Sequence, residues 1–332
     1  MDQELKWGIV GPGKIARAFV QDLARADDRP HRVTAVMSHH LNDAEEFAAK
    51  HGIPYFFDSL KAMLSTAPPD IVYIATPHAA HYSQTMECLE RGIPVLCEKP
   101  LALNLRQAEE MITTARMHGT FLLEGMWIRF LPSLRKVLEL LQQGVIGKVN
   151  GVVADMSYKA PRDQKNRFYN PALGGGSLLD LGIYPVYLAL LILGEPVYLK
   201  ATASLSAEQI DEGCMIILKY TGGAYALLQS SIVKETEKQA RLYGEKGFIT
   251  IQTPWNEKPA GITVTLYHGE SQTYPCTWEG RGFQYEIAEA GRCLSAGKTE
   301  SDLHNHAISL SLMSLLDDIR AQAHIRYPAD ER

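Results

Sequence analysis

The sequence has few cysteines, no excess of basic residues and no long uninterrupted apolar run. Its five cysteines are scattered through 332 residues, and no pair has the spacing of a zinc site. We therefore expect reduced thiols in a cytoplasmic protein that carries no structural metal. Lysine and arginine together number 33 against 38 aspartates and glutamates, for a formal net charge of −5. This balance predicts no nucleic-acid partner, because such proteins usually present a clustered basic surface.

Signals for export or membrane insertion are also weak. Residues 1–7 lack the basic and apolar regions that mark a signal peptide. The most apolar stretch, 178–193, is interrupted by Asp180, Gly182 and Pro185, so we expect it to be too short and too broken to cross a membrane. The composition is that of an ordinary globular protein, with 46% hydrophobic and 21% charged residues. At this length we expect two domains, each large enough for its own core.

The first third of the chain alternates short apolar runs with helical patterns. Strands are predicted at 5–10, 31–37, 55–57, 70–75, 94–97 and 121–123, and helices at 13–25, 43–51, 59–64, 77–90 and 103–118. Thr76 and Pro77 fit an N-cap followed by proline at the first helical position. Strands and helices that alternate with short links predict a doubly wound parallel sheet, a Rossmann fold, over residues 1–128.

The pattern changes after about residue 128. Helices are predicted at 131–143, 177–193, 283–296 and 305–323, and strands at 148–158, 197–205, 214–220, 224–233, 239–243, 248–251, 262–267 and 273–276. Gly222 and Gly223 give a tight hairpin signal. A run of strands followed by helices predicts that residues 129–332 form an α+β domain around a large, mainly antiparallel sheet.

A dinucleotide-binding motif lies between the first strand and the first helix. Gly11 permits a tight turn, Gly13 lets a pyrophosphate approach the backbone at the positive end of the helix, and Ala16 allows helix and strand to pack closely. An ordinary glycine turn is the alternative, but the place at the start of a strand–helix–strand pattern favours the dinucleotide. The candidate cofactor contacts from this turn are Gly11, Pro12, Gly13, Lys14 and Ile15.

The end of the second strand bears on the choice between NAD and NADP. NAD-binding sites usually place an acidic residue there to hold the ribose hydroxyls, but this chain has none before Asp43. A carboxylate would repel a 2′-phosphate, whereas Ser38 and His39 can donate hydrogen bonds to one. The pattern therefore favours NADP over NAD. The alternative is that His39 and His40 are ordinary polar loop residues.

Two further loops follow buried strands of the same predicted sheet. In a doubly wound fold, ligands bind beyond the carboxyl ends of the strands, so we expect both loops to face the cofactor. The first loop contains Ala75, Thr76, Pro77, His78 and His81. The two histidines have the spacing of a helical metal pair, but no third ligand is evident, and we favour a contact with the nicotinamide ribose.

The second loop contains Glu98 and Lys99. Beside a nicotinamide, the ammonium of Lys99 can polarise a substrate hydroxyl and support proton transfer. A purely structural lysine at a strand end is the other interpretation. The Lys99–Pro100 bond is also a candidate for the cis form, which about 5% of such bonds adopt in folded proteins.

The most informative stretch runs from Gly174 to Pro185. Asp180 and Tyr184 are four residues apart on a predicted helix and so share a face. A carboxylate and a phenol in an otherwise apolar helix are costly unless they are paired or used. A buried hydrogen bond between them that serves only packing is the alternative. The glycines at 174–176 permit another chain segment to come close.

Together these motifs resemble the glucose–fructose oxidoreductase / inositol dehydrogenase / MocA family. The resemblance covers essentially the whole chain, and its motifs stand in order as Gly11-Pro12-Gly13-Lys14-Ile15-Ala16, Ala75-Thr76-Pro77-His78 with His81, Glu98-Lys99-Pro100, and Gly174-Gly175-Gly176 before Asp180-Leu181-Gly182-Ile183-Tyr184-Pro185. Within the family the chain is most similar to the branch of dimeric dihydrodiol dehydrogenases and NADP-dependent xylose 1-dehydrogenases. The stretch 123–130 carries this likeness, as does Tyr184, where inositol dehydrogenases have histidine.

The resemblance implies an N-terminal Rossmann domain and a C-terminal α+β domain whose open sheet often forms the interface of a homodimer. It implies NADP or NAD as the hydride carrier and a sugar, polyol or cyclic trans-diol as the small-molecule substrate. Motif by motif, it makes Lys99, Asp180 and Tyr184 the catalytic set. Tyr184 is then the expected proton acceptor and Lys99 orients the hydroxyl, although the sequence leaves the assignment between these two open.

The substrate side is less defined. The expected substrate contacts are Trp127, Arg129, Arg167, Asp180, Tyr184 and Phe283. Selectivity is expected in the irregular segment 159–170, which also carries Arg162 and Lys165. The chain departs from its branch at His39, where the branch usually has arginine, and this departure bears on cofactor choice.

Two other functions are compatible with the same fold. One is a non-catalytic NAD(P)-binding regulator, which the presence of Lys99 and of the Asp180–Tyr184 pair disfavours. The other is a cofactor-assisted glycosidase, which would cleave an aryl glycoside and show no net cofactor turnover with free sugars. The sequence leaves this second alternative open.

Overall fold

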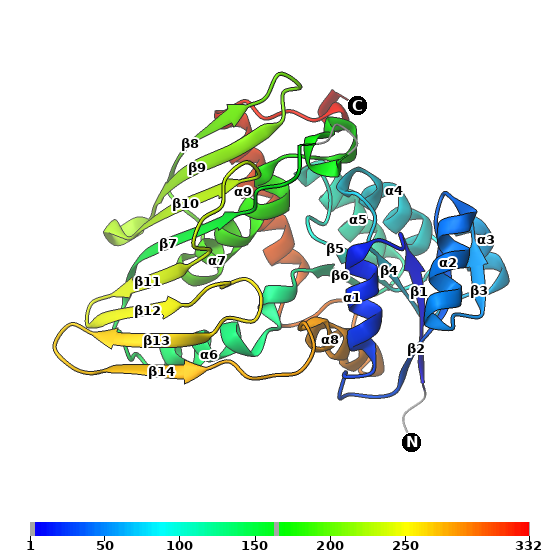
Figure 1. Ribbon diagram of the computed structural model, residues 1–332, viewed down its shortest axis with the longest axis horizontal. Coiled ribbons are helices and arrows are strands. Elements are labelled where there is room, and N and C mark those ends of the chain that lie inside the picture. Colours follow the sequence, from blue (N-terminus) through cyan, green and yellow to red (C-terminus); the bar gives the residue numbers. More distant parts are fainter. Residues whose placement is uncertain (1–3, 163–165, 332) are drawn as a thin grey trace. The chain divides into compact units, whose positions relative to one another are not determined.

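The structure is a computed structural model that describes residues 4–162 and 166–331, and it divides into two compact units (Figure 1). The first unit contains the chain up to Phe130 together with Glu279–Leu310. The second contains Leu131–Trp278 and the chain from Ser311 onward. We expected 279–310 in the second domain, but this segment belongs to the first unit because its apolar side chains complete the core there.

The first unit is built on a parallel six-stranded sheet in the order β3-β2-β1-β4-β5-β6, which confirms the predicted Rossmann fold. Its strands are β1 (Leu5–Val10), β2 (His31–Met37), β3 (Tyr55–Phe57), β4 (Ile71–Ile74), β5 (Val95–Glu98) and β6 (Leu122–Gly125). Its helices are α1 (Lys14–Leu23), α2 (Leu41–His51), α3 (Leu60–Thr66), α4 (His78–Leu89), α5 (Leu105–Met117) and α8 (Phe283–Ser295). The strand order reverses between β1 and β4, and doubly wound sheets bind ligands at this switch point.

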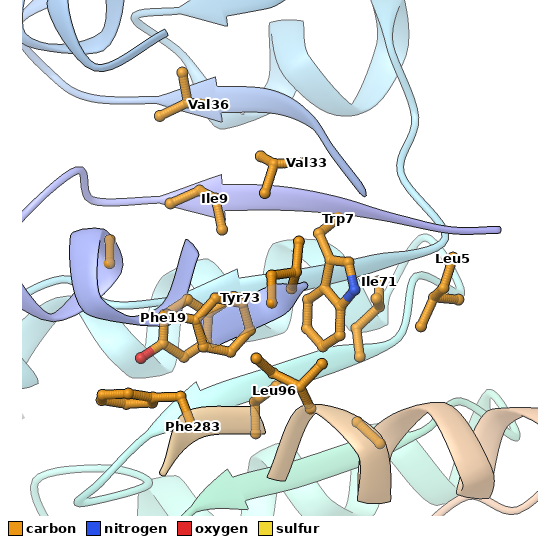
Figure 2. Packing of buried hydrophobic residues seen from close by; sticks show 14 of the residues in the cluster. Leu5, Trp7, Ile9, Phe19, Val33, Val36, Ile71, Tyr73, Leu96 and Phe283 are labelled. Atoms are coloured by element: carbon orange, nitrogen blue, oxygen red, sulfur yellow. The ribbon is translucent and has the colours of Figure 1, made fainter. Parts of the chain in front are cut away.

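Aromatic side chains form the centre of the core in the first unit. Phe19 of α1 stacks on Tyr73 of β4 with ring centroids 3.8 Å apart, and it meets Trp7 of β1 in a T-shaped pair at 5.2 Å. Figure 2 shows these rings together with Leu96 and Phe283. Such pairs contribute about 0.5–1.5 kcal/mol each beyond their buried area. They hold α1, and with it the glycine turn, against the sheet.

The second unit is built on an eight-stranded sheet in the order β14-β13-β12-β11-β7-β10-β9-β8 (Figure 1). Its pairings are antiparallel except for the parallel pair of β7 and β10, which confirms the mainly antiparallel sheet. The strands are β7 (Val149–Ser157), β8 (Tyr198–Leu205), β9 (Asp211–Lys219), β10 (Tyr225–Ser231), β11 (Ala240–Gly244), β12 (Gly247–Ile251), β13 (Gly261–Leu266) and β14 (Ser271–Pro275). The helices are α6 (Pro132–Gln142), α7 (Ile183–Leu193) and α9 (His306–Ala323), the last of which begins in the first unit.

One face of the second sheet is covered and the other is open. α7 packs on β7 and β10, and α6 packs on β13. From Cys214 to Lys219 of β9 the side chains alternate, so that Ile216 and Leu218 are buried while Met215 and Ile217 are exposed. This period of two is typical of a sheet with a single covered face.

The apolar stretch before residue 193 is longer than we expected. Among the described residues, the helical segment Pro171–Leu193 has 23 residues and a mean hydropathy of 1.8, enough by length and composition to cross a membrane. However, 83% of its most apolar window is buried within the protein. The segment is therefore a core helix of the second unit, which explains its apolar composition.

Three local features differ from the sequence predictions. α4 begins at His78 rather than at Pro77, and the Thr76 hydroxyl donates to Gln84 Oε1 at 2.7 Å instead of capping the helix. The helix expected from residue 177 opens with a π-helical turn, Leu178–Gly182. β9 begins at Asp211 rather than at residue 214. All five cysteines are free thiols, as expected.

Candidate active site

The loop after β1 forms an open cradle at the start of α1. Gly11 has a φ of +89°, and a Cβ there would lie 2.8 Å from Thr76 Cγ2 and 3.0 Å from the Ala75 carbonyl oxygen. Gly13 is the N-cap of α1, and a Cβ there would meet no described heavy atom within 4 Å. Gly11 is therefore required by the packing of the turn. Gly13 leaves open space beside a helix N-terminus, where phosphate groups bind.

A pocket of about 340 Å³ opens at this cradle. Its lining includes the predicted cofactor residues Gly11, Pro12, Gly13, Ser38, Ala75, Thr76 and Pro77. Three other predicted contacts, Lys14, Ile15 and His39, are exposed and lie outside this lining in the described part of the chain. The structure thus brings the ends of β1, β2 and β4 together around one pocket.

The pocket also contains charged residues that were not among the expected cofactor contacts. Arg17 of α1 and Lys50 of α2 supply two cations, and Asp43 and Glu46 of α2 supply two carboxylates. Burial, with the charges of Lys50 and Arg17, lowers the pKa of His51, so both cations act on the same end of α2. Arg17 directly follows the glycine motif, but no local pattern shows that it faces the end of β2.

His81 connects the loop after β4 to the loop after β5. Its ring is fully buried, with Nε2 2.9 Å from the Thr76 carbonyl oxygen and Nδ1 2.8 Å from the Pro100 carbonyl oxygen. Burial and the neighbouring His78 lower the pKa of His81 to about 4, although the two carbonyl groups oppose this shift. At pH 7 such a ring is neutral and carries one N–H, so it donates to only one of these two carbonyl oxygens. Within residues 4–162 and 166–331, no group of three or more His, Cys, Asp or Glu side chains could hold a metal ion.

The loop after β5 places Lys99 at the carboxyl edge of the sheet. Lys99 is 9% exposed and follows Glu98, whose Oε1 accepts a hydrogen bond of 2.5 Å from the Tyr73 hydroxyl. The backbone nitrogen of Lys99 donates to Glu98 Oε2 at 3.3 Å, and the Lys99–Pro100 bond is cis. Burial and the charge of Glu98 raise the pKa of Glu286 on α8 well above its usual range. The neutral form of Glu286 is therefore favoured beside the charge of Glu98.

The predicted catalytic residues of the second unit lie on its buried helical segment. Asp180 is 5% exposed in the π-helical turn, and Tyr184 is 8% exposed at the start of α7. Arg167 donates to both carboxylate oxygens of Asp180, at 2.9 and 3.2 Å. The guanidinium also lies 4.4 Å from the ring centroid of Phe168. A bidentate charged contact of this kind is strong and fixes the orientation of the carboxylate.

The glycine run before this segment is explained by two close approaches. A Cβ on Gly175 would lie 2.6 Å from the Arg167 carbonyl oxygen. Gly176 has a φ of +115°, and a Cβ there would lie 2.0 Å from Oδ1 of Asp211. The glycines thus admit both the segment that carries Arg167 and a buried carboxylate from β9. Asp211 was missed in the sequence because it precedes the apolar run by which we recognised that strand.

The remaining substrate candidates lie mostly in the first unit. Trp127, in the short helix Trp127–Arg129, is 5.0 Å from Phe283 between ring centroids, and Phe283 is buried in the core. Arg129 Nε donates to the Leu303 carbonyl oxygen at 2.7 Å. In the segment expected to set selectivity, Arg162 pairs with Glu212 at 3.1 Å, whereas residue 165 lies outside the described residues. Among these candidates, Arg167 is the one that the structure brings to Asp180.

The chemistry of the first unit fits a nicotinamide dinucleotide. The open space at Gly13 and the pocket that runs from the glycine turn to the end of β2 have the form of a pyrophosphate and ribose site. Lys99 lies in the loop after β5. In the sheet, β5 is the neighbour of β4 on the side away from β1. Ligands of such sheets contact these successive loops.

Comparison with known families agrees with this geometry. Residues 5–126 match an oxidoreductase family with an NAD-binding Rossmann fold, and residues 134–250 match the C-terminal domain of the same GFO/IDH/MocA proteins. The chain belongs to the Gfo/Idh/MocA oxidoreductase family. The resemblance inferred from the motifs is thereby confirmed. As a member of this family, the protein is a nicotinamide-dependent oxidoreductase.

Curated Gfo/Idh/MocA relatives are similar over nearly the whole chain. The trans-1,2-dihydrobenzene-1,2-diol dehydrogenase of Xenopus tropicalis is 34% identical over 97% of this chain and 99% of its own length. The enzyme of that name from Mus musculus is 33% identical over 99% of both chains. These relatives are dehydrogenases that match both units, which supports the same reaction class for this chain.

Solved structures show the same architecture. An aldose-aldose oxidoreductase from Caulobacter crescentus, complexed with glycerol, aligns with a TM-score of 0.87 at 25% identity. A 3-ketoreductase from Actinomadura kijaniata, in complex with NADP and TDP-benzene, aligns with a TM-score of 0.85 at 25% identity. Each alignment covers 97% of this chain and 98% of the other.

Proposed function

We propose that the protein is an NADP-dependent dehydrogenase that oxidises a hydroxyl or lactol carbon of a sugar or polyol, or a cyclic trans-diol. The observation that carries the proposal is Lys99, a nearly buried ammonium at the carboxyl edge of a dinucleotide-binding sheet. An ammonium there can hold a substrate hydroxyl and stabilise negative charge that develops on its oxygen. The relatives named as dihydrodiol dehydrogenases and as an aldose-aldose oxidoreductase support this substrate class.

The roles of the catalytic side chains follow from their chemistry. When bound, the nicotinamide supplies the hydride acceptor of the oxidation and the donor of the reverse reaction. We assign the proton to Tyr184, which accepts it from the substrate hydroxyl as a phenolate and leaves the oxidation step as a neutral phenol. Lys99 orients that hydroxyl and favours loss of the proton by its positive charge. Asp180 accepts a hydrogen bond from the substrate and is itself oriented by Arg167.

The Arg167–Asp180 pair supports a hydroxylated substrate. Its carboxylate is nearly buried, whereas 42% of the Arg167 side chain is exposed. A ligand can therefore reach the guanidinium from solvent, while the carboxylate stays fixed behind it. Because guanidinium N–H groups donate and carboxylate oxygens accept, the pair can recognise neighbouring hydroxyls of a sugar or diol.

The preference for NADP rests on the charged end of the pocket. Ser38 offers a hydroxyl there, and Arg17 and Lys50 offer the cations that a 2′-phosphate needs. His39 is exposed outside the lining, so we assign the phosphate contact to Arg17 and Lys50 instead. The carboxylates of Asp43 and Glu46 partly offset the positive charge of Arg17 and Lys50, which limits the preference for NADP over NAD.

Cofactor choice is tested with Ser38→Asp, using kcat/KM with NADP and with NAD. We expect the unmodified protein to prefer NADP and the variant to prefer NAD, because a carboxylate repels the phosphate and accepts from ribose hydroxyls. His39→Ala is the comparison variant and should keep the ratio unchanged. Equal use of both cofactors by the unmodified protein would count against this assignment.

We also infer a homodimer formed through the open face of the second sheet. Large apolar side chains stand exposed on three neighbouring strands of this face: Tyr198, Met215, Ile217, Tyr225 and Leu227. An apolar patch on contiguous strands is a common mark of a protein interface. A second copy of this chain is the occupant that the family resemblance favours.

The dimer is tested by sedimentation of Leu227→Lys, with Met117→Lys as the control. Met117 is exposed on α5 and belongs to the first unit, not to the second sheet. We expect twice the chain mass for the unmodified protein and for the control, and a single chain mass for Leu227→Lys. A monomeric unmodified protein would overturn the inference.

The reaction itself is tested with a panel of aldoses, polyols and cyclic trans-diols. Absorbance of the reduced nicotinamide is followed with NADP and with NAD separately, and net reduction with at least one class is the expected result. An aryl glycoside forms the second arm of the experiment. Its cleavage without net cofactor turnover on any free sugar would replace the dehydrogenase with the cofactor-assisted glycosidase.

A further inference from the structure

A buried carboxylate holds the start of the helical segment that carries Asp180. Asp211 is the first residue of β9, and its side chain is fully buried. Its Oδ2 accepts hydrogen bonds from Ser177 Oγ at 2.9 Å and from the Leu178 N–H at 2.7 Å. Leu178 opens the π-helical turn, so Asp211 satisfies a backbone donor that a helix leaves unpaired at its first residues.

The surrounding contacts make Asp211 the anchor of a larger junction. Ser177 Oγ also lies 3.0 Å from Ser230 Oγ on β10, and the Tyr327 hydroxyl donates to the Gly175 carbonyl oxygen at 2.8 Å. The backbone nitrogen of the glycine at 176 donates to the Phe168 carbonyl oxygen at 2.9 Å. The turn that bears Asp180 and the segment that bears its arginine partner are therefore both tied to this junction.

The charge of Asp211 changes in a physiological pH range. Burial raises the pKa of Asp211 to about 6, and the hydrogen bonds from Leu178 and Ser177 offset only part of that shift. Burial and the negative charge of Asp211 also raise the pKa of Cys214 to about 12 and that of Tyr327 well above its usual range. These two neighbours therefore stay neutral while Asp211 titrates.

Other charged groups lie around Tyr327 on the C-terminal segment. The Arg320 guanidinium is 4.7 Å from the Tyr327 ring centroid and pairs with Asp317 and Asp330. The charge of Asp180 adds to the shift at Tyr327, and Asp180 itself is paired with Arg167. Asp211 is thus the acid in this junction that bonds directly to the turn.

We propose that Asp211 is a positioning residue for the reaction. As a carboxylate it fixes the turn that carries Asp180, and as a neutral acid it holds that turn less firmly. Through Asp180 it also positions the guanidinium of Arg167. Hydrogen bonds to an ionised acceptor are roughly twice as strong as neutral ones. The proposal rests on the role given above to Asp180. It predicts that kcat falls at low pH because Asp211, which does not touch the reacting atoms, becomes protonated.

The test compares Asp211→Asn, Asp211→Ala and the control Asp155→Asn in the full-length protein. An asparagine can keep both bonds on its amide oxygen but carries no charge, so it imitates the protonated acid. Asp155 of β7 likewise accepts from backbone nitrogens, those of Lys238 and Gln239 at 3.2 Å each, but has no part in this junction. kcat, KM, the NADP dissociation constant and Tm are measured for each variant from pH 5 to 8.

In the unmodified protein we expect kcat to fall through an acidic limb near pH 6. Asp211→Asn should lack this limb and keep kcat at one low level from pH 5 to 8, equal to that of the unmodified protein at pH 5 and about 3- to 10-fold below it at pH 8. Asp211→Ala should lose about 100-fold, as expected for a misplaced catalytic group, with NADP binding unchanged. The control should lower Tm but leave kcat as it was.

Hydrogen exchange of the peptide that spans 177–183 gives a readout independent of turnover. Exchange, corrected for the intrinsic effect of pH, should rise in Asp211→Asn and in the unmodified protein at pH 5, but not in the control. If exchange rises in this way while no sugar or diol is turned over, the proposed function fails and the anchoring stands. If Asp211→Asn keeps both the full kcat and the acidic limb, or if Asp211→Ala lowers only Tm, the proposal is overturned.

Discussion

Acidification should destabilise the first unit through His81, by an amount that follows from its pKa. Burial lowers the pKa of His81 in the folded protein to about 4, against an ordinary value of 6.5. Between about pH 6.5 and pH 4, His81 is protonated in the unfolded chain but not in the folded protein. The stability contributed by the neutral ring is therefore present above pH 6.5 and is lost as the pH falls through 4. The full loss is about 3 kcal/mol, of which about 2 kcal/mol is reached by pH 5.

The assay is denaturant unfolding of the wild type and of His81→Gln at pH 7.5 and pH 5.0. The variant removes the titration, so its free energy of unfolding should fall by about 2 kcal/mol less than that of the wild type. For unfolding of the whole protein Asp211 has the opposite sign, because unfolding returns its carboxylate to water, whereas the turn can loosen while Asp211 stays buried. A folded pKa raised to about 6 gives stability at low pH that is lost as the pH rises through 6. Asp211→Asn should therefore be more sensitive to acid than the wild type. Equal pH dependence in the wild type and His81→Gln would refute the reasoning.

Two further predictions concern the site directly. Tyr184→Phe should lower kcat by about 10²–10⁴-fold, the usual worth of a general acid–base group, and lower the unfolding free energy by only about 1 kcal/mol. A lower Tm with unchanged kcat per folded molecule would instead make Tyr184 structural. Gly11→Ala should lower Tm, because its Cβ would collide with Thr76 at a φ of +89°. The Cβ of Gly13→Ala would meet open space, so this variant should keep its Tm. It should nevertheless bind NADP about tenfold more weakly, a loss of about 1.4 kcal/mol. Unchanged NADP binding in a titration would show that Gly13 is not part of the phosphate site.

Features encoded in local sequence could be predicted well. The strand Leu5–Val10, the glycine turn and α1 follow one another in a short stretch, and each has its own signal of periodicity or backbone freedom. The place of Lys99 at a strand end followed in the same way from the apolar run before it. These local signals were enough to predict the Rossmann fold, whereas the family came from the resemblance of the motifs to known proteins.

Features that depend on distant contacts could not be predicted from those signals. Arg167 is thirteen positions from Asp180, and nothing in the irregular segment between them shows that the two side chains meet. Asp211 comes close to Gly176 because β9 pairs with β10 in the sheet. No local sequence pattern encodes that strand pairing. α8 was placed in the wrong unit for the same reason, since its amphipathic pattern shows a buried face but not the core that covers it.

The central claim is that Lys99 serves hydride transfer to a nicotinamide bound by the first unit, and its most direct test is Lys99→Met. Turnover of the best substrate of the panel is measured by absorbance of the reduced nicotinamide, and NADP binding is titrated on the same preparation. The account predicts that turnover is nearly abolished, by about 10²–10⁴-fold, while NADP binding remains measurable. Full turnover in Lys99→Met would contradict it.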